Sequence, residues 1–325
     1  MSTRPDKPFP SSHFSQPGPR LFIISEGSCL RTMKEEMLKV EGGSIWYRMA
    51  GNGGVPLVVL HGGPGTTHDY LDNLEALSDE RTVVLYDQLG GGRSDRPADR
   101  DLWKVDRFAE ELDALIRHLG FKRFHLLGQS WGTMLAVLYA RKYGQNGIAS
   151  LVLSAPYLSS PLWEADQRRH VDDLPEKERK AILDCEASGD YSSPAYAEAM
   201  DVFYRRHVCR MPVWPENLNR TLQGMGMDVY NTMWGPSEFT LTGNMKNLDV
   251  TPFLPDLRVP VLYTCGEFDE ATPDTSRRYS ELTPDSRVLI FAGASHMHHL
   301  EMEIEYLAAV RDFLGKNKDR GRAPE

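Results

Sequence analysis

The sequence predicts an α/β fold with a mostly parallel sheet flanked by helices, and two observations lead to this prediction. Short apolar, β-branched runs recur along the 325-residue chain, and each ends near Gly, Asp or Ser. Stretches with helical spacing of apolar residues separate several of these runs. Continuous apolar runs of this length are typical of strands buried on both faces. Their alternation with helices favours a parallel sheet.

The strands and helices can be placed along the chain. The predicted strands are 45–50, 56–63, 82–88, 123–130, 150–156, 259–267 and 287–293. The clearest predicted helices are 105–120, 131–144 and 305–315. The first helix collects its large apolar residues on one face and ends at Gly120, a residue that suits a helix C-terminus. The second is mostly apolar, which indicates a helix buried against the sheet.

One region interrupts the alternation of strands and helices. Residues 157–250 contain helix-like stretches without a strong strand pattern, so we predict a helical cap inserted into the core. The core then comprises residues 38–156 and 251–316. A polar, proline-rich N-terminal extension covers residues 1–37, and residues 317–325 form a C-terminal tail. Because ligands in open α/β sheets bind beyond the C-terminal ends of the strands, such a cap would cover a site there.

Composition and charge exclude several classes of function. The formal net charge of -9 argues against a nucleic-acid partner or an anionic membrane surface. No apolar run approaches the ~20 residues of a membrane helix, and the N-terminus lacks the apolar stretch of a secretory signal. The cysteines are scattered without paired spacing, which favours free thiols in the cytoplasm over disulfides or a zinc site. They are Cys29, Cys185, Cys209 and Cys265.

Residues 128–133, GQSWGT, place Ser130 in the pattern G-x-S-x-G. The pattern alone is weak, but here a predicted strand precedes it and a predicted helix follows. That context is typical of a nucleophile elbow, in which the flanking glycines permit a sharp turn. The Trp131 N–H would then lie at a helix N-terminus, where an anion is stabilised. The alternative is a Gly-Ser turn that only joins a strand to a helix.

Acidic residues follow the strand at 259–267. Glu267, Asp269 and Glu270 are all candidates for a carboxylate that orients a histidine and stabilises its charged form. We select Asp269 because it lies in a strand-end loop and keeps the chain order Ser, Asp, His. The alternative is an acidic loop that faces solvent.

Histidines follow the last predicted strand. His296 comes first and is the predicted general base, whereas His298 and His299 open the final helix and have no evident need to reach Ser130. A metal site is the alternative, but a spacing of i, i+2, i+3 suits one helical face poorly. The loop HGGPG (61–65) follows a strand and can supply a second oxyanion N–H through Gly63. The alternative is a tight loop without that role.

With these residues in order, the sequence resembles the proline iminopeptidase family of the α/β-hydrolase superfamily, with its L-amino-acid and prolinamide amidase relatives. The resemblance covers about residues 38–315. The motifs that carry it are HGGPG, YDQLGGGRSDRP, GQSWGT, GPSEFTLTG, GEFDEATP and SHMHHLE. It implies an α/β-hydrolase fold with a helical cap, no cofactor and no metal. It implies a triad of Ser130, Asp269 and His296, with an oxyanion hole formed by the N–H groups of Gly63 and Trp131.

The resemblance also implies a recognition site for the substrate amine. Glu238, in the motif G-P-x-E-F, and Glu270, directly after the triad acid, would hold a free α-amino group. A cationic amine in a closed pocket requires charge-assisted partners. Without the resemblance, the sequence favours Glu238 as a surface residue of the cap.

The implied function is that of a serine hydrolase that releases an N-terminal residue, proline in this family, from small peptides or amino-acid amides. Three alternatives stay open at this point. One is an esterase or lactonase on the same triad, and another is an amidase of broader preference. The third is a protein that binds a ligand without turnover, since fold does not imply function.

Overall fold

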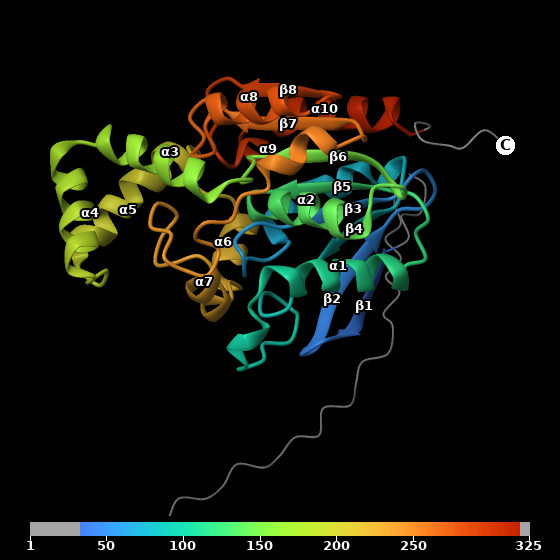
Figure 1. Cartoon of the computed structure of the whole chain (residues 1–325), viewed down its shortest axis with the longest axis horizontal. Coiled ribbons are helices and arrows are strands. Elements are labelled where there is room, and N and C mark those ends of the chain that lie inside the picture. The colour runs from blue at the N-terminus through green and yellow to red at the C-terminus, as the bar shows by residue number, and fades with distance from the viewer. Residues whose placement is uncertain (1–32, 319–325) are drawn as a thin grey trace, which may run out of the picture.

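The structure is a computed structural model that describes residues 33–318. Eight strands form one sheet in the order β1-β2-β4-β3-β5-β6-β7-β8 (Figure 1). They are β1 (Met33–Val40), β2 (Gly43–Ala50), β3 (Leu57–Leu60), β4 (Val83–Tyr86), β5 (Phe124–Gln129), β6 (Ile148–Ser154), β7 (Val261–Gly266) and β8 (Ser286–Phe291). Strand β2 is antiparallel to both neighbours, and the neighbouring pairs from β4 to β8 are parallel. The predicted α/β class with a mostly parallel sheet is confirmed.

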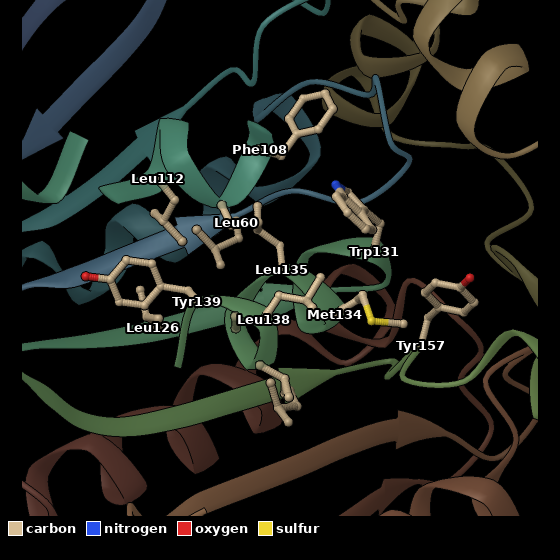
Figure 2. Close-up of a cluster of buried hydrophobic side chains, with 14 of the residues drawn as sticks. Leu60, Phe108, Leu112, Leu126, Trp131, Met134, Leu135, Leu138, Tyr139 and Tyr157 are labelled. Atoms are coloured by element: carbon tan, nitrogen blue, oxygen red, sulfur yellow. The ribbon is translucent and has the colours of Figure 1, made fainter. Parts of the chain in front are cut away.

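Helices cover both faces of the sheet (Figure 1). One face carries α1 (Val105–His118), α2 (Trp131–Tyr143) and α8 (Pro273–Leu282), and the other carries the 3₁₀ helix η1 (Asp69–Asp79) and α10 (Glu303–Lys316). Each face carries an apolar cluster: the first lies under α1 and α2, and the second lies under η1 and α10. Strand β3 shows why. Val58 and Leu60 pack into the first cluster, and Leu57 and Val59 pack into the second, as the two-residue period of a strand requires. Figure 2 shows the first cluster, in which α1 and α2 pack on β3 and β5.

The sheet begins earlier than the sequence indicates. Strand β1 starts at Met33, so the predicted N-terminal extension to residue 37 is wrong for residues 33–37. Its sequence MKEEMLKV pairs antiparallel with β2 along its full length, from Met33 opposite Ala50 to Val40 opposite Gly43. An antiparallel edge strand needs only one apolar face, so charged residues can fill the other. The rest of the extension, including Cys29, lies outside the described residues.

The predicted cap, residues 157–250, contains five helices and no strand of the sheet. They are α3 (Ser160–Asp172), α4 (Glu176–Ser188), α5 (Pro194–His207), α6 (Glu216–Gln223) and α7 (Met227–Met233). Helices α4 and α5 lie farthest from the sheet, whereas α3, α6 and α7 lie nearer to it (Figure 1). A small apolar core that includes Val171, Ile182 and Phe203 holds α3, α4 and α5 together. That residues 157–250 form a separate cap domain stays a prediction.

Three short helices complete the described chain: η2 (Arg100–Leu102), η3 (Thr251–Asp256) and α9 (His298–Glu301). Within residues 33–318, no helix combines the length and the apolar character that crossing a membrane would require.

Candidate active site

The site lies where the strand order reverses. Strands β3 and β5 are neighbours in the sheet. The chain that leaves β3 goes on to β4 on one side, and the chain that leaves β5 goes on to β6 on the other side, so a crevice forms between the two connections. Leu60, the last residue of β3, pairs with Gly128 of β5. The loop HGGPG therefore begins beside the turn that carries Ser130. In open α/β sheets this crevice is where ligands bind.

Ser130 occupies a strained turn between β5 and α2. Its backbone has φ 53° and ψ −122°, a conformation that residues with a side chain seldom adopt. Hydrogen bonds hold the turn on both sides. The Ser130 N–H donates to the Ser154 carbonyl at 3.0 Å, and the Thr133 hydroxyl donates to the Ser130 carbonyl at 2.6 Å. The geometry projects the serine side chain out of the sheet and into a cavity.

The flanking glycines are required by close contacts. A Cβ atom on Gly128 would lie 2.2 Å from the Gly132 carbonyl oxygen, and one on Gly132 would lie 2.2 Å from the Leu60 carbonyl oxygen. Both neighbours are backbone atoms that cannot move independently. The glycines of G-x-S-x-G therefore permit the turn to cross itself and permit α2 to rest on the end of β3.

Gly132→Ala is expected to destabilise the fold by about 1–3 kcal/mol, because the new methyl group displaces the β3 backbone. It should also lower activity, since β3 leads directly into the HGGPG loop. Urea unfolding measures the first effect and steady-state kinetics the second. Gly315→Ala is the matched control, because Gly315 also lies in a helix but a Cβ there meets nothing within 4 Å. The prediction is wrong if the two variants unfold alike.

His296 and Asp269 are in direct contact. The His296 Nδ1 lies 2.7 Å from the Asp269 Oδ1, and both side chains are buried. The N–H groups of Ala271 and Gly266 donate to the two Asp269 oxygens at 2.8 and 3.2 Å and fix the carboxylate. Glu267, the earlier candidate in this loop, is exposed and accepts from the Gly293 N–H instead. Of the three acidic candidates, Asp269 is therefore the one within hydrogen-bond distance of His296.

A second histidine, His298, lies next to Asp269, and the sequence analysis gave it no role. The His298 Nε2 lies 3.0 Å from the Ser154 hydroxyl and 2.9 Å from the Thr264 hydroxyl. Its Nδ1 lies 3.7 Å from the Asp269 Oδ2. Burial lowers the pKa of His298 well below its ordinary value, so the ring is neutral. The only available signal was the proximity of His298 to His296 in the sequence.

Tyr70 and Gln129 link the loops of the site, and the sequence analysis missed both. The Gly62 N–H donates to the Tyr70 hydroxyl at 2.7 Å, and that hydroxyl donates to the Gln129 Oε1 at 2.6 Å. The Gln129 amide donates in turn to the His296 carbonyl at 3.4 Å. The network joins the HGGPG loop, the serine turn and the histidine loop. Gln129 could have been suspected from its place beside Ser130, but nothing local indicates Tyr70.

A cavity of about 210 Å³ brings the predicted residues together. Ser130, His296, Gly63, Glu238 and Glu270 all line it. Gly62 packs directly on the serine, because a Cβ atom there would lie 3.0 Å from the Ser130 Cβ. This contact sets the HGGPG loop beside the reactive side chain.

Trp131 is the predicted site residue whose side chain lies elsewhere. Its indole is buried in the core, and the indole N–H donates to the Gln88 Oε1 at 2.9 Å. Its predicted role concerns only the backbone. Trp131 is the first residue of α2, so its N–H has no partner within the helix.

The two glutamates that line the cavity, Glu238 and Glu270, differ in their hydrogen bonding. The Tyr230 hydroxyl donates to the Glu238 Oε1 at 2.7 Å, and burial raises the pKa of Glu238. Glu270 is 1% exposed, and neither of its carboxylate oxygens meets a hydrogen-bond donor among the described residues. Burial, followed by the charges of Glu238 and Asp269, raises the pKa of Glu270 well above its ordinary value. The nearest ring nitrogen, the His296 Nε2, lies 3.6 Å from the Glu270 Oε1, beyond hydrogen-bond distance. A buried carboxylate that accepts no hydrogen bond is costly, so this position suits a cationic ligand.

The helical region fixes the loops that carry two of these residues. The carbonyl of His207, at the end of α5, accepts from the His296 N–H at 3.0 Å and from the Glu270 N–H at 3.3 Å. The next carbonyl, of Val208, accepts from the Met297 N–H at 2.9 Å. The end of α5 thus contributes to the order of the site through its backbone.

The close histidines at the C-terminal end do not converge on one point. His296 contacts Asp269, His298 contacts two hydroxyl groups, and the His299 Nε2 lies 3.1 Å from the Tyr70 carbonyl. Their divergence argues against the metal alternative for this cluster.

Elsewhere, His68, Asp69 and Asp72 bring possible ligand atoms within 4.8 Å of one another. Both acids are already paired with arginines. The Arg48 Nη2 lies 2.7 Å from the Asp72 Oδ1, and the Arg220 Nε lies 3.1 Å from the Asp69 Oδ1. A cation there would have to compete with two guanidinium groups.

Comparison with known proteins agrees with this geometry. Residues 55–302 match the family described as alpha/beta hydrolase fold. A proline iminopeptidase of Heyndrickxia coagulans is 46% identical over 86% of this chain and 98% of its own. The crystal structure of the Mycobacterium smegmatis proline iminopeptidase superposes with a TM-score of 0.81 at 37% identity, covering 87% of this chain and 98% of the other. The structure of VinJ superposes with a TM-score of 0.83 at 36% identity, with the same coverage.

Proposed function

Because the chain belongs to the proline iminopeptidase family of the α/β hydrolases, we propose that it releases an N-terminal residue, preferentially proline, from small peptides or amino-acid amides. The proposed reaction is acyl transfer to Ser130 followed by hydrolysis. The proposed triad is Ser130, Asp269 and His296.

In the first half of the reaction, the His296 Nε2 takes the proton of Ser130 as its oxygen attacks the substrate carbonyl. The 2.7 Å contact of the His296 Nδ1 with Asp269 supports this role. It favours the tautomer in which Nδ1 carries the hydrogen and donates to Asp269, so Nε2 can accept the serine proton. The N–H groups of Gly63 and Trp131 stabilise the negative oxygen of the tetrahedral intermediate. His296 then gives its proton to the departing amine, and the acyl group stays on Ser130.

In the second half, His296 removes a proton from water, which attacks the acyl-enzyme and releases the N-terminal residue. Ser130 regains its proton. No other nucleophile or cofactor is needed for these steps.

The observation that carries the proposal is the carboxylate of Glu270, which accepts no hydrogen bond from the described residues and lies in the same cavity as Ser130 and His296. The α-amino group of a substrate, a charged donor, would satisfy its oxygens and those of Glu238. We propose that an amine held there places the first peptide bond of the substrate at Ser130. This explains why an enzyme with this site would act as an aminopeptidase and not as an endopeptidase.

A panel of substrates tests the function directly. We expect prolyl p-nitroanilide to be cleaved, and we expect N-acetylation of the proline to lower kcat/KM by at least about 100-fold, because the carboxylates would be buried without a cationic partner. Alanyl p-nitroanilide reports the preference at the N-terminal residue. Equal rates with and without the acetyl group would contradict the proposal. Cleavage of a p-nitrophenyl ester alone would instead favour the esterase alternative.

We also propose a cytoplasmic location. The support is that the cysteines among the described residues, Cys185, Cys209 and Cys265, are free and buried. Free buried thiols are typical of a reducing compartment.

A further inference from the structure

The most exposed part of the cavity wall lies between α6 and α7. Of the residues that line it, Leu222 and Met227 alone are exposed, at 49% and 50%. Leu222 lies in the last turn of α6, Met227 begins α7, and Met225 lines the cavity between them. We call these three residues the rim. Large apolar side chains half exposed at a cavity entrance indicate a surface that contacts a ligand.

The direction of a bound substrate follows from burial. The carboxylate of Glu270 is at the closed end, and Ser130 and His296 are 7% and 4% exposed. When the substrate amine reaches Glu270 and the scissile carbonyl reaches Ser130, the leaving amine is the part of the substrate that still needs a binding surface. The open side of the cavity is the place that can receive a group of any length. The leaving amine therefore lies against the rim.

The rim is held by backbone contacts with the catalytic loops. The Gly226 N–H donates to the Gly65 carbonyl of the HGGPG loop at 2.7 Å, and the Gly92 N–H donates to the Gly224 carbonyl at 3.0 Å. Helix α6 is fixed as well, because the Thr221 hydroxyl accepts from the Tyr70 N–H at 3.0 Å. These contacts keep the rim at a set position relative to the reaction centre, so the surface is formed before substrate binds.

The charged side chains that flank the rim are already engaged. Arg220 pairs with Asp69 and Asp72, and Arg100 pairs with Asp228. The Arg96 guanidinium donates to the Gly224 carbonyl at 2.5 Å. A charge on the leaving amine would therefore have to displace one of these contacts to gain a partner, whereas an apolar side chain would cover Leu222 and the two methionines.

We propose that the rim is the subsite for the leaving group and that it selects uncharged, apolar leaving amines. Suitable substrates carry leucine, phenylalanine or an aromatic amine after the N-terminal residue. The proposal rests on the proposed function and adds a second determinant of specificity to it. Methionine side chains adapt to many shapes, so aliphatic and aromatic leaving groups are accepted alike.

The test compares kcat/KM for prolyl-leucinamide, prolyl-glycinamide and prolyl-aspartamide. We expect the leucine substrate to exceed the glycine substrate by about tenfold and the aspartate substrate to be poorest. Met227→Gln and Leu222→Asn should each reduce the leucine-to-glycine ratio to about threefold. Ile304→Gln is the control, because Ile304 is an apolar residue of α10 that is 81% exposed and does not line the cavity. It should leave the ratio unchanged.

The outcomes separate the two proposals. If all prolyl substrates are cleaved equally, or if the rim variants keep the wild-type ratio, the aminopeptidase function stands and the leaving-group subsite is wrong. If the aspartate substrate is preferred, the subsite is also wrong, because the rim then receives a charge. If no aminoacyl substrate is cleaved while an ester is, the proposed function fails and the subsite fails with it.

Discussion

Ser130→Ala is expected to lower kcat/KM on prolyl p-nitroanilide by at least about 10⁴-fold while leaving the fold intact. The substitution removes only the nucleophilic oxygen. The hydrogen bonds that hold the turn come from the backbone N–H and carbonyl of residue 130, and an alanine keeps both. Steady-state kinetics measure the loss, and circular dichroism checks the fold. Ser188→Ala, at an exposed serine of α4, controls for the preparation of the variants.

The proposed triad also predicts how the effects of two substitutions combine. Residues that act as one unit have effects that do not add. His296→Ala should therefore cost about as much as Ser130→Ala, and the double variant should cost no more than either single variant. Normal turnover in Ser130→Ala would contradict the mechanism altogether. Additive losses would show that His296 assists catalysis without acting through Ser130.

The core of the fold could be predicted because the signals are local. Strands β3 to β7 are continuous apolar runs, and each lies within its predicted range apart from the start of β6. Strand β1 was missed because its charged residues hide the alternation of a one-sided strand. Its pairing with β2 depends on a register that only the folded sheet defines.

The residues of the site also fall into those that local sequence patterns indicate and those that only the folded structure brings together. Ser130 and Gly63 lie in recognisable motifs. The sequence favours Asp269 for its chain order and its strand-end loop, and His296 because it comes first after the last strand; the structure brings these two side chains into contact, and their catalytic roles stay predictions. The contacts of His298 with Ser154 and Tyr70 with Gln129 join residues that are 144 and 59 positions apart. No local pattern carries such information. These residues emerge only when the sheet brings the ends of β3, β5, β6 and β7 together.

Glu270→Gln is expected to lower kcat/KM for prolyl p-nitroanilide by roughly 10–100-fold, because an amide replaces the charge that binds the substrate ammonium. The pH profile should change too. Burial raises the pKa of Glu270, so in the wild-type protein kcat/KM falls as the pH decreases through that raised value and the carboxylate becomes protonated. In the variant this part of the acidic limb should be absent. Glu267→Gln, at the exposed acid of the same loop, should alter neither quantity.

The same substitution should make the protein more stable at neutral pH. A folded-state pKa above the ordinary value of 4.5 means that the folded protein retains a proton that the unfolded chain releases. The free energy of unfolding therefore decreases as the pH rises from about 4.5 through the raised pKa. Glu270→Gln removes that decrease, so urea unfolding should show equal stability near pH 4.5 and a more stable variant at pH 8. Each kcal/mol recovered should raise Tm by roughly 2 °C in a chain of this size.

A stable but impaired Glu270→Gln variant would show that the carboxylate is retained for substrate and not for the fold. That is the expected pattern for a binding site that is incomplete until its ligand arrives, because the substrate amine supplies the hydrogen bonds that the carboxylate otherwise lacks. A variant that is less stable at pH 8 than the wild type would contradict this account. It would mean that Glu270 has a structural partner, and the amine would then have to be recognised by Glu238 alone.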